Sequence, residues 1–492
     1  MTKQFIKNFK ESKQRVLKLL EQGVVGKPGN LLQVVKKIYK KRDAILAIAE
    51  HRPTPFYLFD EEALEASIKE FNDAFNKFLP ACKAYYAMKA NHHSALIKSV
   101  LRHGFGIDVS SGRELGIARE HGARDILFSG PGKTVAELEY ALEQSDYVTI
   151  NMDSFSELKK LSLLAKKQKK AVRCGVRVYI NSTLAWTKFG IPLNELKDFW
   201  REAAKSPYIK LQGIQFHLSW NKNGDAYEHA FQKLGEYLRT EFSEEMRTEI
   251  KFIDFGGGFY PNRSEGYYPW SSYYPWSSPA GAILHKTNLH YGEKSHFKDN
   301  YYITETMPFR DYARAIAKAI KHHIAPLLNC EFYTEPGRII CNNAMHIVLQ
   351  IVDVKKPGHV ITDGGVNITG SEYGERFYFP ILNLTSPAMK EIECTMYGSL
   401  CTPHDIWGYY CYAKKVSEGD IIIVPNQGAY RYVLAQNFIK PIPEVRSLTE
   451  AREIGILGHL QPNHHNYVRR SRTLSRRTSP VARHTRRSST KP

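Results

Sequence analysis

Segments with the pattern of a strand and segments with the pattern of a helix alternate about eight times over roughly 270 residues of this chain. The apolar run 106–109, for example, is followed by the amphipathic run 112–120. Such an alternation is typical of parallel strands covered by helices, and eight repeats predict an α/β fold of the (β/α)8-barrel type over residues 51–330. The predicted strands are 54–60, 84–88, 106–109, 126–129, 147–150, 171–178, 211–218 and 250–255, and a helix at 308–327 is expected to close the barrel.

The pattern changes after residue 332, where short β-rich segments follow one another. This change predicts a compact C-terminal domain of antiparallel β-strands over residues 331–465. Between residues 260 and 300 the sequence Tyr-Tyr-Pro-Trp-Ser-Ser occurs twice. The repeat indicates an extended insertion or lid near the site, and the alternative is a surface loop with a short duplication.

The net charge of +19 is concentrated at the two ends of the chain. Residues 1–50 contribute +8 and residues 468–492 contribute +9, so the middle carries only +2. We expect residues 1–50 to form basic amphipathic helices that pack against the body, with membrane-surface or partner binding as the alternative. Residues 466–492 should form a disordered basic tail. The nearly neutral body argues against a nucleic-acid-binding protein and leaves only weak anion or RNA binding through the tail.

Cysteine content and hydropathy limit the class of protein further. The seven cysteines form no CxxC pair, which indicates a reducing cytoplasm and argues against a disulfide framework or a structural zinc site. No metal site is predicted. No apolar run approaches the roughly 20 residues that a membrane-spanning helix needs. We therefore expect a cytoplasmic protein without a membrane segment.

Lys89 follows the predicted buried strand 84–88 and is the only charged residue of that stretch. A lysine in such a position either extends its ammonium group to solvent or serves chemistry. A desolvated lysine loses its proton more easily and becomes a nucleophile that can form a Schiff base with a carbonyl group. The stretch by itself leaves both interpretations open.

Four further motifs follow along the chain, and each has a structural alternative. His217 ends a predicted strand, where it could stack on a ligand or serve the fold. The three glycines at 256–258 could offer N–H groups to a phosphate or form a tight turn. Glu335 and Arg338 could bind a ring nitrogen and a phosphate, or form a local ion pair. Cys401 could be an acid or a nucleophile, or a buried apolar side chain.

In this order the motifs supply a Schiff-base lysine, a stacking histidine, phosphate ligands and a carboxylate for a ring nitrogen, which are the parts of a pyridoxal phosphate site. From about residue 52 to residue 440 the sequence resembles the fold-type III pyridoxal phosphate-dependent decarboxylases, the diaminopimelate, ornithine, lysine and arginine group. It is most similar in style to diaminopimelate decarboxylase. The family shares an alanine racemase-like barrel. The resemblance rests on residues 86–91, 106–111, 254–259, 335–338, 398–405 and 428–430.

The resemblance implies a role for each matched residue. Lys89 would carry the cofactor, pyridoxal 5'-phosphate, as a Schiff base, with Asp108 close to both. Cys401 would protonate the product. Because this cysteine comes from the partner subunit in the family, the resemblance also implies a homodimer with shared active sites. The remaining cofactor ligands would be His217 on the ring face, Glu335 at the ring nitrogen, and Gly257, Gly258, Gly337, Arg338 and Tyr430 at the phosphate.

Two of these residues favour one reaction. Glu335 would keep the ring nitrogen protonated, which makes the ring a strong electron sink after the loss of CO2. An alanine racemase is expected to have an arginine at that position and a tyrosine as its second base. The combination of Glu335 with Cys401 therefore favours decarboxylation. A racemase or aldolase on the same scaffold, and a non-catalytic cofactor-binding paralogue, are the alternatives.

Departures from the family pattern leave the substrate open. The usual His-x-Gly-Ser is His-Leu-Ser-Trp here, with Ser219 one position early and Trp220 in the last place. Thr402 stands where an acidic residue usually contacts the distal amino group of the substrate. Asp405 and Arg376 are the further candidates for substrate binding, with Arg376 assigned to a carboxylate. The expected substrate is an amino acid with a second amine: a diaminopimelate-like compound, or D- or L-ornithine or lysine.

Overall fold

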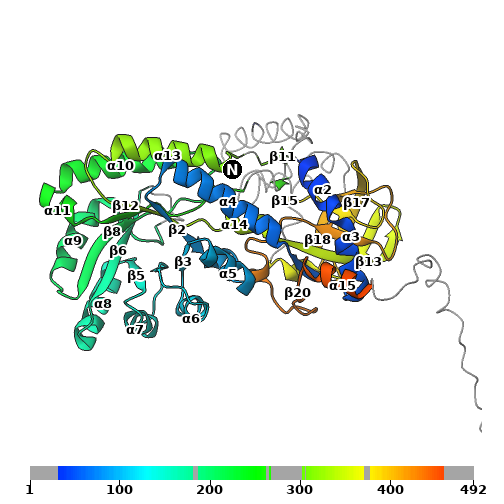
Figure 1. Ribbon diagram of the computed structural model, residues 1–492, viewed down its shortest axis with the longest axis horizontal. Coiled ribbons are helices and arrows are strands. Elements are labelled where there is room, and N and C mark those ends of the chain that lie inside the picture. The colour runs from blue at the N-terminus through cyan, green and yellow to red at the C-terminus, as the bar shows by residue number, and fades with distance from the viewer. Residues whose placement is uncertain are drawn as a thin grey trace, which may run out of the picture.

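The computed structural model describes residue 11 and residues 31–180, 187–261, 265–267, 302–304, 306–370 and 377–458. These residues form two bodies, a barrel covered by helices and a second β-sheet with helices beside it (Figure 1). The described chain begins in the second body, passes through the barrel, and returns to the second body.

The barrel is a closed ring of eight parallel strands, so the predicted (β/α)8 barrel is confirmed. Each strand pairs in parallel with the next, and the last strand pairs with the first to close the ring. Strands buried on both faces read as continuous apolar runs, which is why the sequence pattern located most of them. The strands are β2 (Cys82–Ala87), β3 (Gly106–Val109), β4 (Ile126–Phe128), β5 (Val148–Met152), β6 (Val172–Tyr179), β8 (Ile209–Gln215), β9 (Phe252–Asp254) and β12 (Glu331–Thr334).

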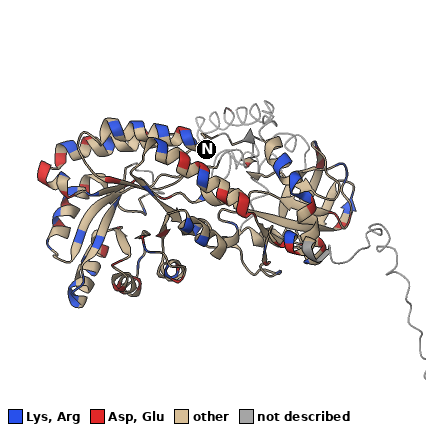
Figure 2. Ribbon diagram, in the orientation of Figure 1, with Lys and Arg blue, Asp and Glu red and all other residues tan. Residues whose placement is uncertain are grey.

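Amphipathic helices cover the barrel. Asp60, Ser111, Thr134 and Ser154 each precede a helix, and each side-chain oxygen accepts a hydrogen bond from a backbone N–H of the first turn. Basic and acidic residues are interspersed along the ribbons of the long helices (Figure 2). The helices are α4 (Glu61–Phe78), α5 (Ser94–Arg102), α6 (Gly112–Glu120), α7 (Val135–Glu143), α8 (Phe155–Gln168), α9 (Leu196–Ala204), α10 (Asp225–Glu241), α11 (Glu244–Glu249) and α13 (Phe309–His323).

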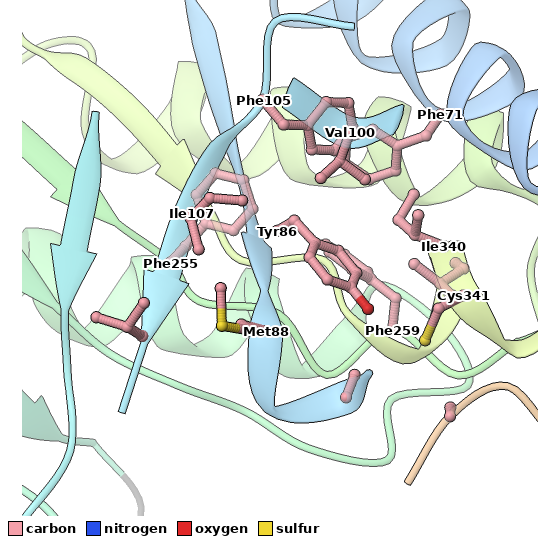
Figure 3. Packing of buried hydrophobic residues seen from close by; sticks show 14 of the residues in the cluster. Phe71, Tyr86, Met88, Val100, Phe105, Ile107, Phe255, Phe259, Ile340 and Cys341 are labelled. Carbon is pink, nitrogen blue, oxygen red and sulfur yellow. The ribbon is translucent and has the colours of Figure 1, made fainter. Parts of the chain in front are cut away.

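Strand β2 sends its side chains into two different cores. Tyr85 lies in the cluster inside the barrel, where its ring is 5.1 Å from the ring of Tyr333. Tyr86 points to the opposite side, because successive side chains of a strand alternate between its faces. It packs there in the large core between barrel and helices. Figure 3 shows Tyr86 among Phe71, Val100, Phe105, Ile107, Phe255, Phe259, Ile340 and Cys341.

The second body contains an eight-stranded mixed sheet in the order β14-β17-β18-β16-β19-β13-β1-β20. Most neighbours are antiparallel, as the sequence predicts, whereas β1–β20, β14–β17 and β16–β18 are parallel pairs. The strands are β1 (Phe56–Phe59), β13 (Met345–Lys356), β14 (His359–Thr362), β16 (Leu382–Asn383), β17 (Glu391–Tyr397), β18 (Ile406–Tyr412), β19 (Ile421–Val424) and β20 (Val445–Ser447).

Two strands lie in a different body from the one expected. The predicted first barrel strand, β1, pairs instead with β13 and β20 of the second sheet. The eighth barrel strand is β12, which lies just inside the range 331–465 expected for the β-domain. The expected boundaries at residues 51 and 331 therefore do not separate the two bodies. The reason is that an apolar run predicts a strand but not its pairing partners.

Helices near the two ends of the described chain cover the second sheet. Helices α2 (Leu31–Lys40) and α3 (Arg42–His51) bury an apolar stripe against it, so the expected packing of the N-terminal extension on the body is observed for residues 31–51. Helix α15 (Glu450–Gly458) joins the same cluster through Ala451 and Ile454. The stripe consists of Val35, Ile38, Ile45 and Ile48, and it meets Phe56, Leu58, Val348, Leu382 and Ile423.

The remaining described elements are short.

None of the helices within the described ranges is long and apolar enough to cross a membrane. Most of the insertion at 260–300, the tail at 466–492 and Arg376 lie outside the described residues. The short elements are β7 (Ile191–Pro192), β10 (Gly266–Tyr267), β11 (Tyr302–Ile303), β15 (Phe377–Tyr378), α14 (Arg338–Cys341), and the 3₁₀ turns η2 (Met88–Ala90), η3 (Leu193–Glu195), η6 (Asn342–Ala344), η7 (Val366–Ile368) and η8 (Tyr432–Leu434).

Candidate active site

The carboxyl ends of the barrel strands bring the predicted cofactor residues to one rim. Lys89 lies in the turn η2 that follows β2, and Asp108 lies in β3. His217 follows β8, and Glu335 follows β12. Strands of a barrel all end at the same face, which explains how residues far apart in sequence gather here. A cavity of about 280 Å³ opens at this rim, and its walls include Lys89, His217, Gly258, Glu335, Arg338 and Tyr430.

Lys89 and Asp108 form an ion pair, with 2.9 Å between Lys89 Nζ and Asp108 Oδ2. Asp108 is fully buried, whereas 34% of the Lys89 side chain is exposed. Burial lowers the pKa of Lys89, but the carboxylates of Asp108 and Glu335 more than offset this effect and raise it. Burial and Glu335 in turn raise the pKa of Asp108 to about 7, against the effect of the Lys89 ammonium. The lysine is thus anchored at the cavity by a buried acid.

Glu335 is held in the buried wall by its neighbours. Gln215 Nε2 donates a hydrogen bond to Glu335 Oε1 over 3.1 Å, and His217 Nδ1 lies 3.3 Å from Glu335 Oε2. Burial would raise the pKa of Glu335, but the hydrogen bond with His217 and the charge of Lys89 lower it below its ordinary value. Glu335 is therefore a buried carboxylate that keeps its negative charge.

Asp254 lies behind Glu335 at the end of β9 and is fully buried. Its Oδ1 accepts a hydrogen bond from Gly256 N over 2.9 Å, and its Oδ2 accepts one from Asn151 Nδ2 over 3.3 Å. Burial and the nearby charge of Glu335 raise the pKa of Asp254 well above its ordinary value. Asp254 is therefore the acid of this group that keeps its proton, which lets it donate a hydrogen bond to Glu335.

The three glycines after β9 leave no room for side chains. Gly256 and Gly258 have φ values of 68° and 83°, a region that favours glycine. A Cβ atom added at Gly258 would lie 1.8 Å from the carbonyl oxygen of Leu218, and one at Gly257 would lie 2.0 Å from that of Glu335. The backbone here can approach a ligand closely, as a phosphate cradle requires.

The second body completes the wall of the cavity. Tyr430 N donates a hydrogen bond to the carbonyl oxygen of Ala90 over 2.8 Å, which fixes the segment of Tyr430 next to the lysine turn. The ring of Tyr430 lies 5.1 Å from the guanidinium carbon of Arg338. Gly337 packs against the same turn, because a Cβ at this position would be 3.0 Å from that of Ala87.

These residues fit pyridoxal 5'-phosphate. Lys89 offers an amine, Glu335 offers a carboxylate for a ring nitrogen, and Arg338 offers a guanidinium at the cavity wall with Gly258. The cradle at 256–258 is closed to a Cβ, and the cavity joins all of these groups. The structure therefore brings together the cofactor residues that the sequence predicts.

Of the predicted substrate residues, Thr402 and Asp405 lie within the described part of the chain, and neither lines the cavity. Cys401 is exposed and Thr402 is partly buried in the same turn, and neither lines the cavity beside Lys89. Asp405 is buried, and its carboxylate accepts hydrogen bonds of 2.7 Å from the backbone N–H groups of Val366 and Leu400. Asp405 thus helps to hold the turn of Cys401, and its expected contact with substrate stays a prediction.

Two further features could not be fully predicted from the sequence. Gln215 carries no motif, although it ends β8 two residues before His217, and the alternation of side chains along an extended chain places the two on the same side. Ser219 and Trp220 both line the cavity. Trp220 has a φ of 59° and is 57% exposed, and its ring lies 4.9 Å from the guanidinium carbon of Arg338. The tryptophan thus adjoins the arginine expected to bind phosphate.

Comparisons with known proteins agree with this site. Residues 65–273 match the family model described as "Pyridoxal-dependent decarboxylase, pyridoxal binding domain". The diaminopimelate decarboxylase of Archaeoglobus fulgidus is 27% identical over 413 residues, which cover 80% of this chain and 87% of that protein. The 2-[(L-alanin-3-ylcarbamoyl)methyl]-2-hydroxybutanedioate decarboxylase of Staphylococcus aureus is 26% identical over 432 residues, which cover 82% of this chain and 96% of that protein.

A solved structure shows the same fold. Diaminopimelate decarboxylase from M. jannaschii, in co-complex with L-lysine, aligns with a TM-score of 0.67 at 22% identity and covers 81% of this chain and 88% of that one. The family match includes the segments that carry Lys89, Asp108, His217 and the glycines at 256–258. The relatives extend the similarity over both bodies. Residues 65–273 thus match the pyridoxal-dependent decarboxylases, and over both bodies the chain is similar to the fold-type III pyridoxal phosphate-dependent enzymes that release CO2 from amino acids.

Proposed function

We propose that the protein decarboxylates a diamino acid, in a homodimer whose two active sites each take residues from both subunits. The arrangement of Lys89, Glu335 and Arg338 around one cavity carries the proposal. It provides an amine for the aldehyde of the cofactor, a carboxylate for its ring nitrogen and a guanidinium for its phosphate. The other residues proposed to hold the cofactor are Asp108, His217, Gly257, Gly258, Gly337 and Tyr430.

The bound cofactor supplies an electron sink for the electron pair that remains on the substrate carbon when CO2 leaves. Glu335 would hold a proton on the ring nitrogen of the cofactor, because His217 and Lys89 keep its carboxylate ionised. His217 would cover one face of the ring and exclude water from it. The Sγ atom of Cys401 gives a proton to the carbon that has lost its carboxylate.

A diamino acid is the first candidate for the substrate. The relative from Archaeoglobus fulgidus is named a diaminopimelate decarboxylase, which supports a substrate with a second amine. The hydroxyl of Thr402 can accept a hydrogen bond from a distal ammonium group, although it carries no charge. The proposed binding residues are therefore Thr402 for the distal amine and Arg376 for a carboxylate.

The absence of an acid at position 402 also favours a second candidate, an amino acid whose distal end carries carboxylates. Such an end would be repelled by an acidic side chain but not by Thr402. The relative from Staphylococcus aureus is named for a hydroxybutanedioate, which has this chemistry. Arg376 would then bind the distal carboxylate.

The position of Cys401 supports the homodimer. Cys401 is exposed and does not line the cavity of its own subunit. If Cys401 acts in catalysis, the turn that carries it therefore has to enter the cavity of a partner subunit. A run of exposed apolar side chains also begins beside the cavity, and such a run is typical of an interface. It consists of Leu434, Phe438, Ile439 and Ile442. A cytoplasmic location, where the seven cysteines remain thiols, is part of the same proposal.

A CO2-release screen tests the substrate. The full-length protein loaded with pyridoxal phosphate is offered D- and L-ornithine, D- and L-lysine, arginine, meso-diaminopimelate and the substrate of the Staphylococcus aureus relative. Release from a diamino acid supports the first candidate, and release only from the last compound supports the second. Release from none of them contradicts both candidates for the substrate.

Two variants separate cofactor binding from chemistry in this screen. Lys89→Ala should lose both the visible absorbance of the bound cofactor and CO2 release. Cys401→Ala should keep the absorbance and lose sustained CO2 release, because without the thiol the product carbon is not protonated and the site does not turn over. Sedimentation of the full-length protein should give the mass of a dimer, and a monomer that is fully active would contradict the shared site.

A further inference from the structure

A buried carboxylate stands beside the arginine proposed to bind the phosphate of the cofactor. Glu265 Oε1 lies 3.5 Å from Arg338 Nη1, and only 5% of the Glu265 side chain is exposed. The hydroxyl of Tyr260 donates a hydrogen bond to the same carboxylate oxygen. An acidic group in this place is unexpected, since a phosphate is itself strongly negative.

The backbone fixes Glu265 in this position. Its carbonyl oxygen accepts a hydrogen bond of 3.0 Å from the N–H of Thr304. The next residue, Gly266, begins β10, which pairs with β11 on one side and β15 on the other. The carboxylate of Glu265 therefore lies buried next to paired backbone, beside two residues of the cavity wall, Tyr260 and Arg338.

Aromatic rings restrict Arg338. The guanidinium carbon lies 4.9 Å from the ring of Trp220, 5.3 Å from that of Tyr260 and 5.1 Å from that of Tyr430. Such rings hold a guanidinium by stacking and cation–π attraction. Because Arg338 cannot turn away freely, a phosphate that binds it also comes close to Glu265.

Within the described ranges, the charged groups that face Glu265 are Arg338, from the start of α14, and Arg431, which precedes η8. Tyr260 adds a neutral hydroxyl. Burial raises the pKa of Glu265, although both arginines oppose the effect. A phosphate at Arg338 adds negative charge near Glu265 and weakens the attraction between the guanidinium and the Glu265 carboxylate. Both changes favour the neutral form of Glu265.

We propose that Glu265 belongs to the phosphate site and that its carboxyl group takes up a proton when the phosphate binds at Arg338. The inference rests on the proposed assignment of Arg338 to the phosphate, and it is independent of which amino acid is decarboxylated. The complex then holds one proton more than the free protein. Raising the pH therefore weakens the binding of pyridoxal phosphate, in the range where the free protein has lost this proton.

The test compares two ligands that differ only in the phosphate. Full-length protein freed of cofactor is titrated with pyridoxal phosphate and with pyridoxal between about pH 7 and about pH 9, where the phosphate is already a dianion. The ratio of the two dissociation constants cancels the titration of Lys89, which both ligands share. In the wild type, the preference for pyridoxal phosphate should fall with rising pH, by up to about tenfold per pH unit.

The variant Glu265→Gln should remove this dependence and bind pyridoxal phosphate several-fold more tightly at the alkaline end. Glu244→Gln, an exposed glutamate of α11, is the matched control and should behave as the wild type. Weaker binding in Glu265→Gln, or an unchanged pH dependence, would mean that Glu265 only orients Arg338 and would overturn the proposal.

Two further measurements keep the result interpretable. Calorimetry of the wild type in buffers of different ionisation enthalpy should show one more proton taken up with pyridoxal phosphate than with pyridoxal, whether or not the variant folds. Arg338→Met should abolish the preference for pyridoxal phosphate. If the Arg338→Met variant keeps the preference, the assignment of the phosphate to Arg338 fails. If the variant loses the preference but the wild type shows no additional proton uptake, only the role of Glu265 fails.

Discussion

His217 and Glu335 face each other at the rim of the barrel, with His217 Nδ1 3.3 Å from Glu335 Oε2. Burial lowers the pKa of His217, so its ring is neutral near pH 7 although Glu335 opposes the shift. The pKa of Glu335 is lowered, so the carboxylate is charged. The pair therefore presents one negative charge and one neutral ring to the cavity, which is what a protonated pyridine ring requires.

Replacing Glu335 by glutamine should lower kcat by roughly 10²-fold or more, because an amide cannot hold the proton on the ring nitrogen. The cofactor should remain bound, since Lys89 and Arg338 are unchanged. Absorbance of the bound cofactor and CO2 release measure the two effects separately. Glu331→Gln is the control, because Glu331 lies at the opposite end of β12 and is half exposed. Equal activity in the two variants would contradict the role of Glu335.

Mixed dimers should recover activity if Cys401 acts in the site of the partner subunit. Lys89→Ala and Cys401→Ala proteins are each expected to be inactive. When they are unfolded together and refolded, one site of each mixed dimer contains both native residues. Random pairing should then restore about a quarter of the wild-type CO2 release. No recovery, with mixed dimers shown to be present, would place Cys401 in the site of its own subunit or outside catalysis.

Lys133 should stabilise the barrel through a buried charge. Its Nζ donates hydrogen bonds of 2.8 Å to the carbonyl oxygens of Gly130 and Asn151 and to Glu157 Oε1. Lys133→Met should lower the free energy of unfolding by about 3–5 kcal/mol, because it leaves Glu157 buried without its partner. Urea unfolding measures this loss. Adding Glu157→Gln should return part of it, and an unaltered free energy in Lys133→Met would contradict the prediction.

Lys41 should make the stability of the second body sensitive to acid. Lys41 Nζ lies 2.8 Å and 2.7 Å from the two carboxylate oxygens of Asp60, the N-cap residue of α4. Burial raises the pKa of Asp60, but the hydrogen bond with His346 and the pairing with Lys41 lower it below its ordinary value. A depressed carboxyl pKa stabilises the fold above the unfolded value of about 3.9, and this contribution is lost as the pH falls further.

Lys41→Met should therefore lower the free energy of unfolding by about 1–3 kcal/mol at pH 7. The difference from the wild type should shrink as the pH falls below about 4, because Asp60 is then protonated in the variant before it is protonated in the wild type, where its pKa is lower. Urea unfolding at each pH measures it. Lys36→Met, at an exposed position of α2, should have little effect. A difference that stays constant with pH would show that Lys41 acts through packing alone.

The sequence located the barrel because its signal is local. The strand at 106–109 has the same bounds in the pattern and in the structure. The pairing of strands is not local, and the two misplaced strands show this. The run Phe56–Phe59 is buried throughout and has the composition of a barrel strand, yet it pairs with β13. The run Glu331–Thr334 is short and half buried, so it lacks the strong apolar signal of the other barrel strands.

The residues of the candidate site also divide into those that a local motif predicts and those that depend on contacts between distant segments. Lys89 and Glu335 each follow a strand and each belong to a short motif. The order of these motifs along the chain indicates a common cofactor site. Gln215 and Asp254 act through Glu335 and carry no motif of their own for that role. Glu265 belongs to a stretch of sequence without periodicity, and its contact with Arg338 joins residues 73 positions apart. Contacts of this kind require the three-dimensional structure.

The place of β1 between β13 and β20 has a consequence for protein synthesis. The ribosome delivers β1 early and β20 nearly last, with the whole barrel between them. Domains tend to fold as they emerge, so the barrel can close once β12 is made, while β1 waits for both of its neighbours. Tyr430, which completes the wall of the cofactor cavity, also emerges late. A nascent chain therefore completes its cofactor site only shortly before β20 is made and can pair with β1.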